Sequence, residues 1–207
     1  MKKVAKIFVG FVVAVAIAFG GVVVVSNTTR GEFVAKLQTM PNYAQKEGIY
    51  FRVVKFGFIE VVGEFREFHA QGRVENASIT QLKGEINAES VDSQSEKRDE
   101  IVRGEKLLNV AQNPRITFEM SEFVKSSQTS NSKDSAPTLP TFPTLIKGNL
   151  TLNGTTKAIQ LNAHLESNAK SQHIITLSGQ INVKDFGMAN FPVVSDFVDI
   201  GARIVID

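Results

Sequence analysis

The strongest constraint on the fold is a period-two alternation of apolar and polar residues that begins at Gly48. Ile116 and Phe118, for example, alternate with Thr117 and Glu119. Successive side chains of a strand point to opposite faces, so each such run predicts a strand with one buried face. Further runs lie at 82–89, 146–153, 159–166, 175–181 and 198–206, and the stretch 49–70 is long enough for two strands. Together these runs predict about eight strands.

Short connections join most of these runs, which indicates antiparallel neighbours. Between two of them, Asn153-Gly154 is a strong hairpin signal, because both residue types accept a positive φ. An even number of strands lets the last strand pair antiparallel with the first, and closure removes exposed sheet edges. The expected fold class is therefore all-β, an antiparallel barrel of about eight strands. A two-sheet sandwich is the alternative, and alternation alone does not separate the two.

One insertion in the strand series has helical character. Ser93 and Glu96 have capping-box spacing, and residues 96–109 are rich in helix formers. We expect this segment to cover one end of the barrel, either as a lid that opens or as a permanent plug. Residues 126–143 are rich in serine, threonine and proline and predict a loop with no packed structure.

The N-terminus reads as a targeting segment. Lys2, Lys3 and Lys6 precede an uncharged apolar run over residues 7–25, which is followed by a polar stretch up to Arg30. The run suits either a signal peptide cleaved after Ser26 or an uncleaved membrane anchor. In both cases the preceding lysines place the later chain outside the cytoplasm. The expected organisation is a targeting segment or anchor over 1–30, a linker over 31–47 and a barrel domain over 48–207.

Composition argues against several classes of function. A formal charge of +2 supplies no field that would attract nucleic acid, and the absence of cysteine excludes disulfides and thiolate chemistry. The three histidines have no metal-binding spacing, and neither a G-x-S-x-G elbow nor a phosphate loop occurs. Arg98 and Asp99 have the chemistry of an acid–base pair, but a solvated pair on a polar helix face is the expected reading. No catalytic residue, metal or cofactor is predicted.

Four ordered motifs carry a family resemblance. They are Val61-x-Gly63-x-Phe65-x-x-Phe68-x-x-x-Gly72; Arg98-Asp99, Lys106-Leu107-Leu108-Asn109 and Pro114-x-Ile116-x-Phe118; the hairpin from Gly148 to Lys157; and Asp185-Phe186-Gly187. In this order they resemble the motifs of the YceI-like proteins. The resemblance implies a lipocalin-like barrel of the bacterial periplasm that holds a polyisoprenoid chain and is not an enzyme. It also makes an isoprenoid quinone a possible ligand and a homodimer a possible assembly. Lys55 and Ile101 depart from the family, standing where many members carry histidines, as does Val183 near a usual arginine.

The residues themselves also suggest an internal channel. Gly84, Gly148 and Gly179 lie on the inward parity of their strands, where a missing side chain either leaves space or permits a bend in the sheet. The predicted ligand-binding residues are Phe51, Val53, Phe65, Leu82, Gly84, Ile86, Ile101, Leu107, Leu108, Phe118, Gly148, Leu150, Leu161, Leu177, Gly179 and Phe186.

Three functions are compatible with the sequence. The first is a protein that carries or sequesters an isoprenoid-type lipid, either soluble in the periplasm or tethered to the inner membrane by residues 7–25. The second is a lipid isomerase that uses Arg98, Asp99 or Lys55. The third is a structural or stress protein of the envelope whose core is filled. A co-purifying lipid of unchanged structure, turnover of that lipid, or an empty packed barrel would distinguish them.

Overall fold

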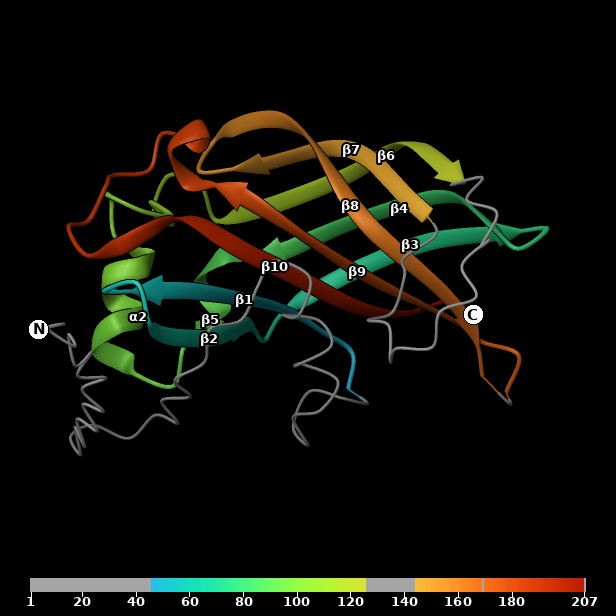
Figure 1. Ribbon diagram of the computed structural model, residues 1–207, viewed down its shortest axis with the longest axis horizontal. Coiled ribbons are helices and arrows are strands. Elements are labelled where there is room, and N and C mark those ends of the chain that lie inside the picture. Colours follow the sequence, from blue (N-terminus) through green and yellow to red (C-terminus); the bar gives the residue numbers. More distant parts are fainter. Residues whose placement is uncertain (1–45, 126–143, 169, 207) are drawn as a thin grey trace, which may run out of the picture.

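The alternating runs form a single curled antiparallel sheet of ten strands in the computed structural model (Figure 1), which describes residues 46–125, 144–168 and 170–206. The strands are β1 Gly48–Lys55, β2 Ile59–Phe65, β3 Phe68–Glu75, β4 Ser78–Asn87, β5 Val91–Asp92, β6 Arg115–Lys125, β7 Thr144–Leu152, β8 Thr155–Ser167, β9 His173–Asn182 and β10 Val194–Ile206.

The strand order is β3-β4-β6-β7-β8-β9-β10-β1-β2-β5, and every pairing is antiparallel. The predicted contact between the first and last long strands is confirmed, since Gly48 of β1 lies opposite Arg203 of β10. The predicted hairpin is also confirmed. Asn153 and Gly154 have φ angles of 48° and 70°, as a tight turn between twisted strands requires.

The prediction of about eight strands was too low because it missed β3 and β5. In β3 the inward positions include Ala70 and Gly72, which weaken the apolar signal, and the strand begins within the stretch 49–70 that predicts two strands. β5 has two residues, too few for any alternation. Strands this weak in sequence are revealed by their pairing partners.

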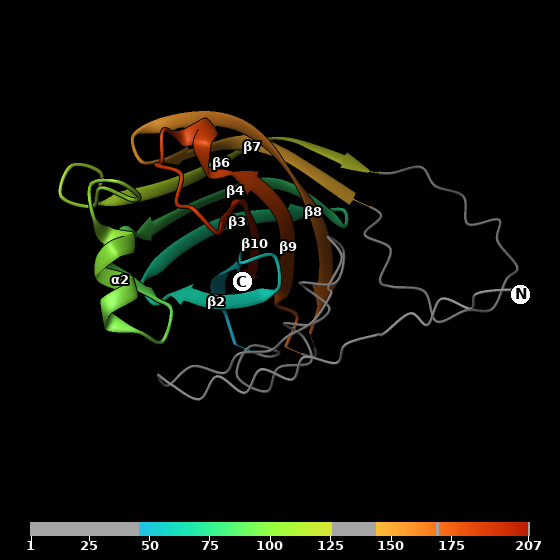
Figure 2. The same cartoon turned by 60° about the vertical axis from the view of Figure 1, so that its left-hand side comes forward.

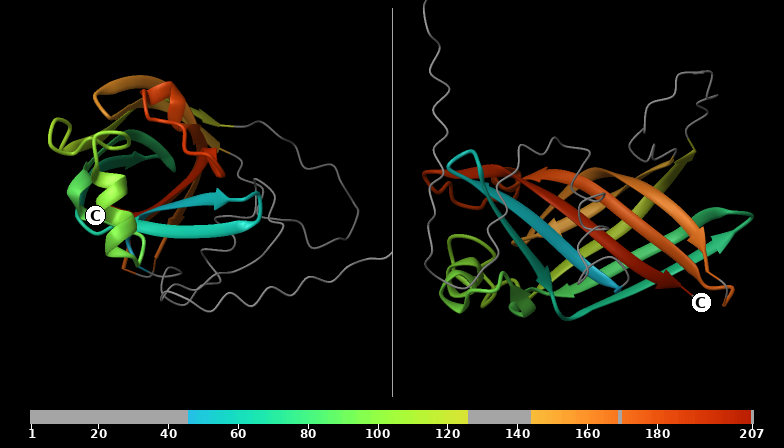
Figure 3. Two further views of the ribbon diagram at one scale, coloured as in Figure 1. Left: turned by 90° about the vertical axis from the view of Figure 1, so that its left-hand side faces the viewer. Right: turned by 60° about the horizontal axis from the view of Figure 1, so that its bottom comes forward.

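The sheet forms a half-barrel and not a closed barrel, because its outermost strands β3 and β5 do not pair with each other. Figure 3 shows the curl of the sheet around one interior. At one end, the 3-10 helix η1 (Ala88–Ser90) is hydrogen-bonded to the β2–β3 connection: the Arg66 N–H donates to the Ser90 carbonyl at 3.1 Å. β2 therefore pairs with β5 and not with β3, which leaves the sheet open. One continuous sheet also excludes the two-sheet sandwich for the described residues.

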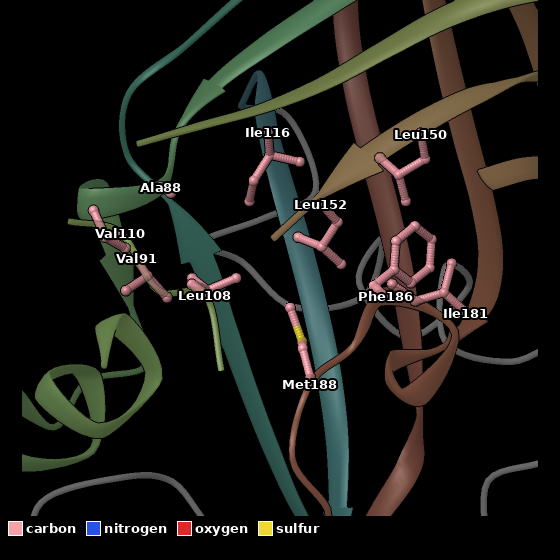
Figure 4. Close-up of a cluster of buried hydrophobic side chains, with 10 residues drawn as sticks. All are labelled: Ala88, Val91, Leu108, Val110, Ile116, Leu150, Leu152, Ile181, Phe186 and Met188. Carbon is pink, nitrogen blue, oxygen red and sulfur yellow. The ribbon is translucent and has the colours of Figure 1, made fainter. Parts of the chain in front are cut away.

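Two clusters of buried apolar side chains fill much of the interior. Figure 4 shows the first, which contains Ala88, Val91, Leu108, Val110, Ile116, Leu150, Leu152, Ile181, Phe186 and Met188. The second contains Ile79, Leu82, Ile146, Leu161, Ala163, Ile175, Leu177, Ile204 and Ile206. Most of these residues hold inward positions that the alternation predicts, and the others come from the segments around η1 and η2 (Val183–Phe186) and from the turns after α2 (Glu96–Arg103).

The helical insertion is present but shorter than predicted. Helix α2 spans Glu96–Arg103, with Ser95 and not Ser93 as its N-cap, and it lies at one end of the half-barrel (Figure 2). Residues 105–112 continue mostly as turns. The predicted targeting segment (1–30), most of the linker (31–47) and the loop 126–143 lie outside the described residues. In the part of the chain that is described, no helix has the length and apolar character needed to cross a bilayer.

Candidate functional site

An apolar hollow lies inside the half-barrel and is the candidate ligand site. Its empty volume is about 650 Å³, which includes space open to solvent. Seven of the predicted ligand-binding residues line it: Leu82, Gly84, Ile86, Phe118, Leu150, Leu161 and Leu177. They come from β4, β6, β7, β8 and β9, so the curl of the sheet brings together residues that are far apart in sequence.

The three inward glycines have different surroundings. A Cβ on Gly84 would meet no atom within 4 Å, so this glycine faces open space. A Cβ on Gly148 would lie 2.5 Å from Cζ of Phe118, and one on Gly179 would lie 2.5 Å from Cδ2 of Leu161. Side chains therefore already fill the space at Gly148 and Gly179, neither of which lines the hollow. Of the three glycines, Gly84 is the one that contributes open volume.

The remaining predicted residues lie outside the hollow. Leu108 and Phe186 are buried in the first cluster, and Phe51, Phe65 and Leu107 pack against it. Val53 is partly buried on β1. Ile101 was expected to face the lumen, but its side chain is 52% exposed on α2. The α2 end of the interior is thus closed by packed side chains, and a ligand role for these residues stays a prediction.

The first YceI-like motif has a packing explanation. The ring of Phe51 lies where a Cβ on Gly63 would be, so only glycine permits this approach. The same ring also meets Phe65, with centroids 5.7 Å apart and planes tilted by 53°. Gly63 and Phe65 of the motif therefore position one aromatic pair beside the first cluster.

Arg98 and Asp99 hold the start of α2 in place. Asp99 was expected on a solvated face, but it is buried and accepts hydrogen bonds from the backbone N–H and the hydroxyl of Ser93. Arg98 Nε donates to Ser93 Oγ at 2.6 Å. Neither residue lines the hollow; Lys55 lies opposite Ile59 at the start of β2, whereas β5, which leads into Ser93, pairs with the end of β2. The structure therefore does not bring together the three candidates for catalysis.

Arg103 fastens the end of α2 to the sheet. Its guanidinium donates to Glu96 Oε1 at 2.8 Å and to the carbonyls of Glu89 and Val91 at 3.0 and 3.3 Å. The hydrogen bond that Arg103 donates to the Glu96 carboxylate raises the pKa of Arg103 above its ordinary value, so the charge persists at any physiological pH. α2 is therefore tied to η1 and β5 by polar contacts.

Side-chain amides connect the last three motifs. Asn113 Nδ2 donates to Asn153 Oδ1 at 3.2 Å, and Asn153 Nδ2 donates to the Phe186 carbonyl at 3.2 Å. Gly187 follows with a φ of 73°, a left-handed conformation that favours glycine. The Asp185-Phe186-Gly187 segment thus buries one phenylalanine and turns the chain, and we find no chemical role for it.

The sequence does not predict a row of polar side chains with little exposure on β9, β10, β1 and β2. These side chains occupy the strand positions that face away from the interior of the half-barrel. Arg52 pairs with Asp199 at 2.5 Å and with Glu60 at 2.7 Å, and Gln180 Nε2 donates to Asp199 Oδ1 at 2.7 Å. Arg52, Glu60 and Asp199 are each 5% exposed. Outward parity alone predicts solvated side chains, so their burial has no signal in the sequence.

The described residues offer little for a polar head group or a metal. Lys55, Ile101 and Val183 do not line the hollow, whose wall is almost entirely apolar. His69 contacts Gln71, His164 contacts Glu166, and His173 contacts Ser167. Within residues 46–125, 144–168 and 170–206, no group of three or more histidine or carboxylate side chains has the arrangement of a metal site.

Comparison with known sequences agrees with this arrangement. The profile of the YceI-like domain matches residues 41–206. A UPF0312 protein of Pseudomonas aeruginosa is 33% identical over 139 residues, which cover 66% of this chain and 65% of that protein. The chain thus spans slightly under two thirds of the length of this relative. A UPF0312 protein of Yersinia pestis is 29% identical over 167 residues and is covered to 80%.

Solved structures show the same fold at lower identity. BcnA of Burkholderia cenocepacia superimposes with a TM-score of 0.63 at 17% identity, covering 77% of this chain and 95% of BcnA. A polyisoprenoid binding domain from Saccharophagus degradans gives 0.56 at 13% identity and is covered to 92%. The YCEI protein of Campylobacter jejuni gives 0.55 at 21% identity and is covered to 82%.

Proposed function

Because the chain belongs to the YceI-like family, we propose that it binds a long apolar lipid of the isoprenoid type inside its half-barrel. The apolar hollow bordered by Gly84 carries this proposal. Its wall offers a hydrocarbon chain continuous contact and offers a charged head group no convergent partners. The polyisoprenoid binding domain from Saccharophagus degradans shares this fold, which supports an isoprenoid as the ligand class.

The protein acts by binding and not by catalysis. Arg98 and Asp99 are engaged with Ser93, and Lys55 pairs with the opposite end of β2 from β5, so no pair of these groups faces the hollow. A lipid isomerase needs a proton donor or acceptor within hydrogen-bond reach of the substrate. This arrangement supports a binding protein over the isomerase alternative.

The energetics favour carrying over permanent storage. Moving a chain of tens of carbons out of water would exceed the affinity ceiling of roughly 18–21 kcal/mol, so the relevant exchange is with a bilayer. Transfer between two apolar environments has a small net free energy, and the length and shape of the hollow then decide which chain binds. We place this exchange in the cell envelope, as the targeting segment over residues 1–30 predicts.

Extraction of the purified full chain tests the proposal. The chain is purified from cells, its lipids are extracted and identified by mass spectrometry, and an unrelated envelope protein purified identically serves as the control. We expect an isoprenoid-type chain, enriched relative to the control and chemically unchanged. A lipid recovered in altered form would support the isomerase. If no lipid is enriched and the protein takes up no fluorescent isoprenoid from vesicles, the proposal is refuted. A structural protein with a filled core is then the remaining alternative.

A further inference from the structure

Three large apolar side chains are exposed together at one end of the half-barrel. Phe56 and Phe58 lie on the β1–β2 turn, and Val193 immediately precedes β10; they are 55%, 53% and 53% exposed. The Phe56 N–H donates to the Val193 carbonyl at 2.6 Å, and Lys55 lies opposite Val194 in the ladder. The two connections therefore form one surface, here named the apolar tip (Phe56, Phe58 and Val193). Both connections extend to the α2 end of the molecule (Figures 1 and 3).

Strained backbone conformations present two of these side chains. Phe56 has a φ of 53° and Val193 a φ of 70°. A positive φ is uncommon outside glycine and is a genuine outlier for a β-branched residue. A turn under no other demand would carry glycine or asparagine at these positions and polar side chains on its surface. Strain that displays apolar groups to solvent points to a function for them.

We propose that the apolar tip inserts into the surface of a lipid bilayer. Single exposed apolar residues are normal, but a cluster on a protruding end marks an interaction surface. The sequence Lys55-Phe56-Gly57-Phe58 places a cation beside two aromatic rings, the combination that favours the boundary between head groups and acyl chains. The ion pairs among the described residues do not include Lys55, so its charge is available to an anionic head group.

The position of the tip fits a chain that is held at a membrane. Roughly twenty residues separate the apolar run 7–25 from Gly48, and an extended chain covers at most about 3.5 Å per residue. Such a connection can reach about 70 Å, well beyond the length of β1, about 26 Å at 3.3 Å per residue. The tip, at the opposite end of β1 from Gly48, can therefore touch the same bilayer. This proposal rests on the exposed surface and does not require a ligand in the hollow.

Tryptophan fluorescence tests the proposal directly, because the chain contains no tryptophan. Phe58→Trp is made in the full chain, which is reconstituted in vesicles of phosphatidylethanolamine and phosphatidylglycerol with or without acyl-chain bromination. Thr80→Trp, an exposed position near the start of β4, is the matched control with the same N-terminal segment. We expect bromination to quench the Phe58→Trp emission about twofold, with a blue shift, and to leave Thr80→Trp nearly unchanged.

Two results would overturn insertion. The first is equal quenching of both tryptophans by bromination. The second is a blue-shifted Phe58→Trp emission that bromine does not quench and that depends on the protein-to-lipid ratio, because a second copy of the chain would then cover the tip. Adding Phe56→Ser to Phe58→Trp removes a second aromatic ring from the tip. The quenching of this double variant should therefore be closer to that of the Thr80→Trp control. Far-ultraviolet circular dichroism verifies that each variant retains its sheet.

Discussion

The ring of Phe118 lies over Gly148 and not over Gly84, although Gly84 is its direct partner in the β4–β6 ladder. Gly148 is opposite Met120 in the β6–β7 ladder, so the ring reaches it diagonally. One glycine is therefore part of a packed contact, while the other borders the hollow. The direction of this single side chain decides where a ligand finds space.

Substitution of these two glycines should separate ligand binding from stability. Gly84→Leu places a side chain in open volume, so we expect uptake of a fluorescent isoprenoid from vesicles to fall several-fold with little change in the unfolding temperature. Gly148→Leu must displace Phe118, and overpacking of this kind costs about 1–3 kcal/mol. Thermal unfolding and vesicle uptake are measured for both variants. Normal uptake by a folded Gly84→Leu protein would show that the ligand does not occupy this hollow.

The buried ionic row should contribute strongly to stability. Arg52→Ala leaves the carboxylates of Glu60 and Asp199 buried without their cation, which should lower the free energy of unfolding by about 3–5 kcal/mol. Lys83→Ala removes an exposed ion pair with Glu119 and should change the free energy of unfolding by less than about 1 kcal/mol. Chemical denaturation measures both. Similar values for the two variants would mean that water screens the Arg52 pairs despite their burial.

Release of α2 should accelerate ligand exchange if the helix acts as a lid. Arg103→Gln removes the charged contacts to Glu96 and Glu89 without altering the apolar core. We expect the free energy of unfolding to fall by about 1–3 kcal/mol. We then expect faster exchange of a fluorescent isoprenoid between protein and vesicles. Arg115→Gln, which breaks an exposed pair with Glu85 on the strands, is the control. An unchanged exchange rate in folded Arg103→Gln would indicate a permanent plug, as the packing of Leu108 would explain.

Reporter fusions can test the membrane topology that the N-terminal lysines predict. A periplasm-dependent reporter fused after Asp207 should be active, because the positive-inside rule places the chain after Arg30 outside the cytoplasm. A reporter that works only in the cytoplasm, fused at the same site, should be silent. The opposite pattern would contradict the predicted location. Replacement of Lys2, Lys3 and Lys6 by glutamine should reduce export in the same assay.

Some residues that line the hollow can be predicted from the sequence, because their direction depends only on their position along a strand. Leu82, Ile86 and Phe118 face inward since the period of a strand is two, and each lines the hollow. The same reasoning failed for Ile101. A helix of eight residues with few apolar positions has no clear apolar face, and the side chain lies on its exposed side. Periodicity predicts orientation only where it extends over several residues.

One-sided antiparallel strands, a tight turn at Asn153-Gly154 and the YceI-like order of motifs can all be predicted from the sequence, because these features depend on neighbouring residues. Three features required the folded arrangement: the sheet stays open between β3 and β5, Phe118 fills the space at Gly148, and Arg52 is buried although it faces away from the interior. Each of these depends on contacts between strands that are distant in sequence. Their geometry is set by how the whole sheet curls, which no local pattern encodes.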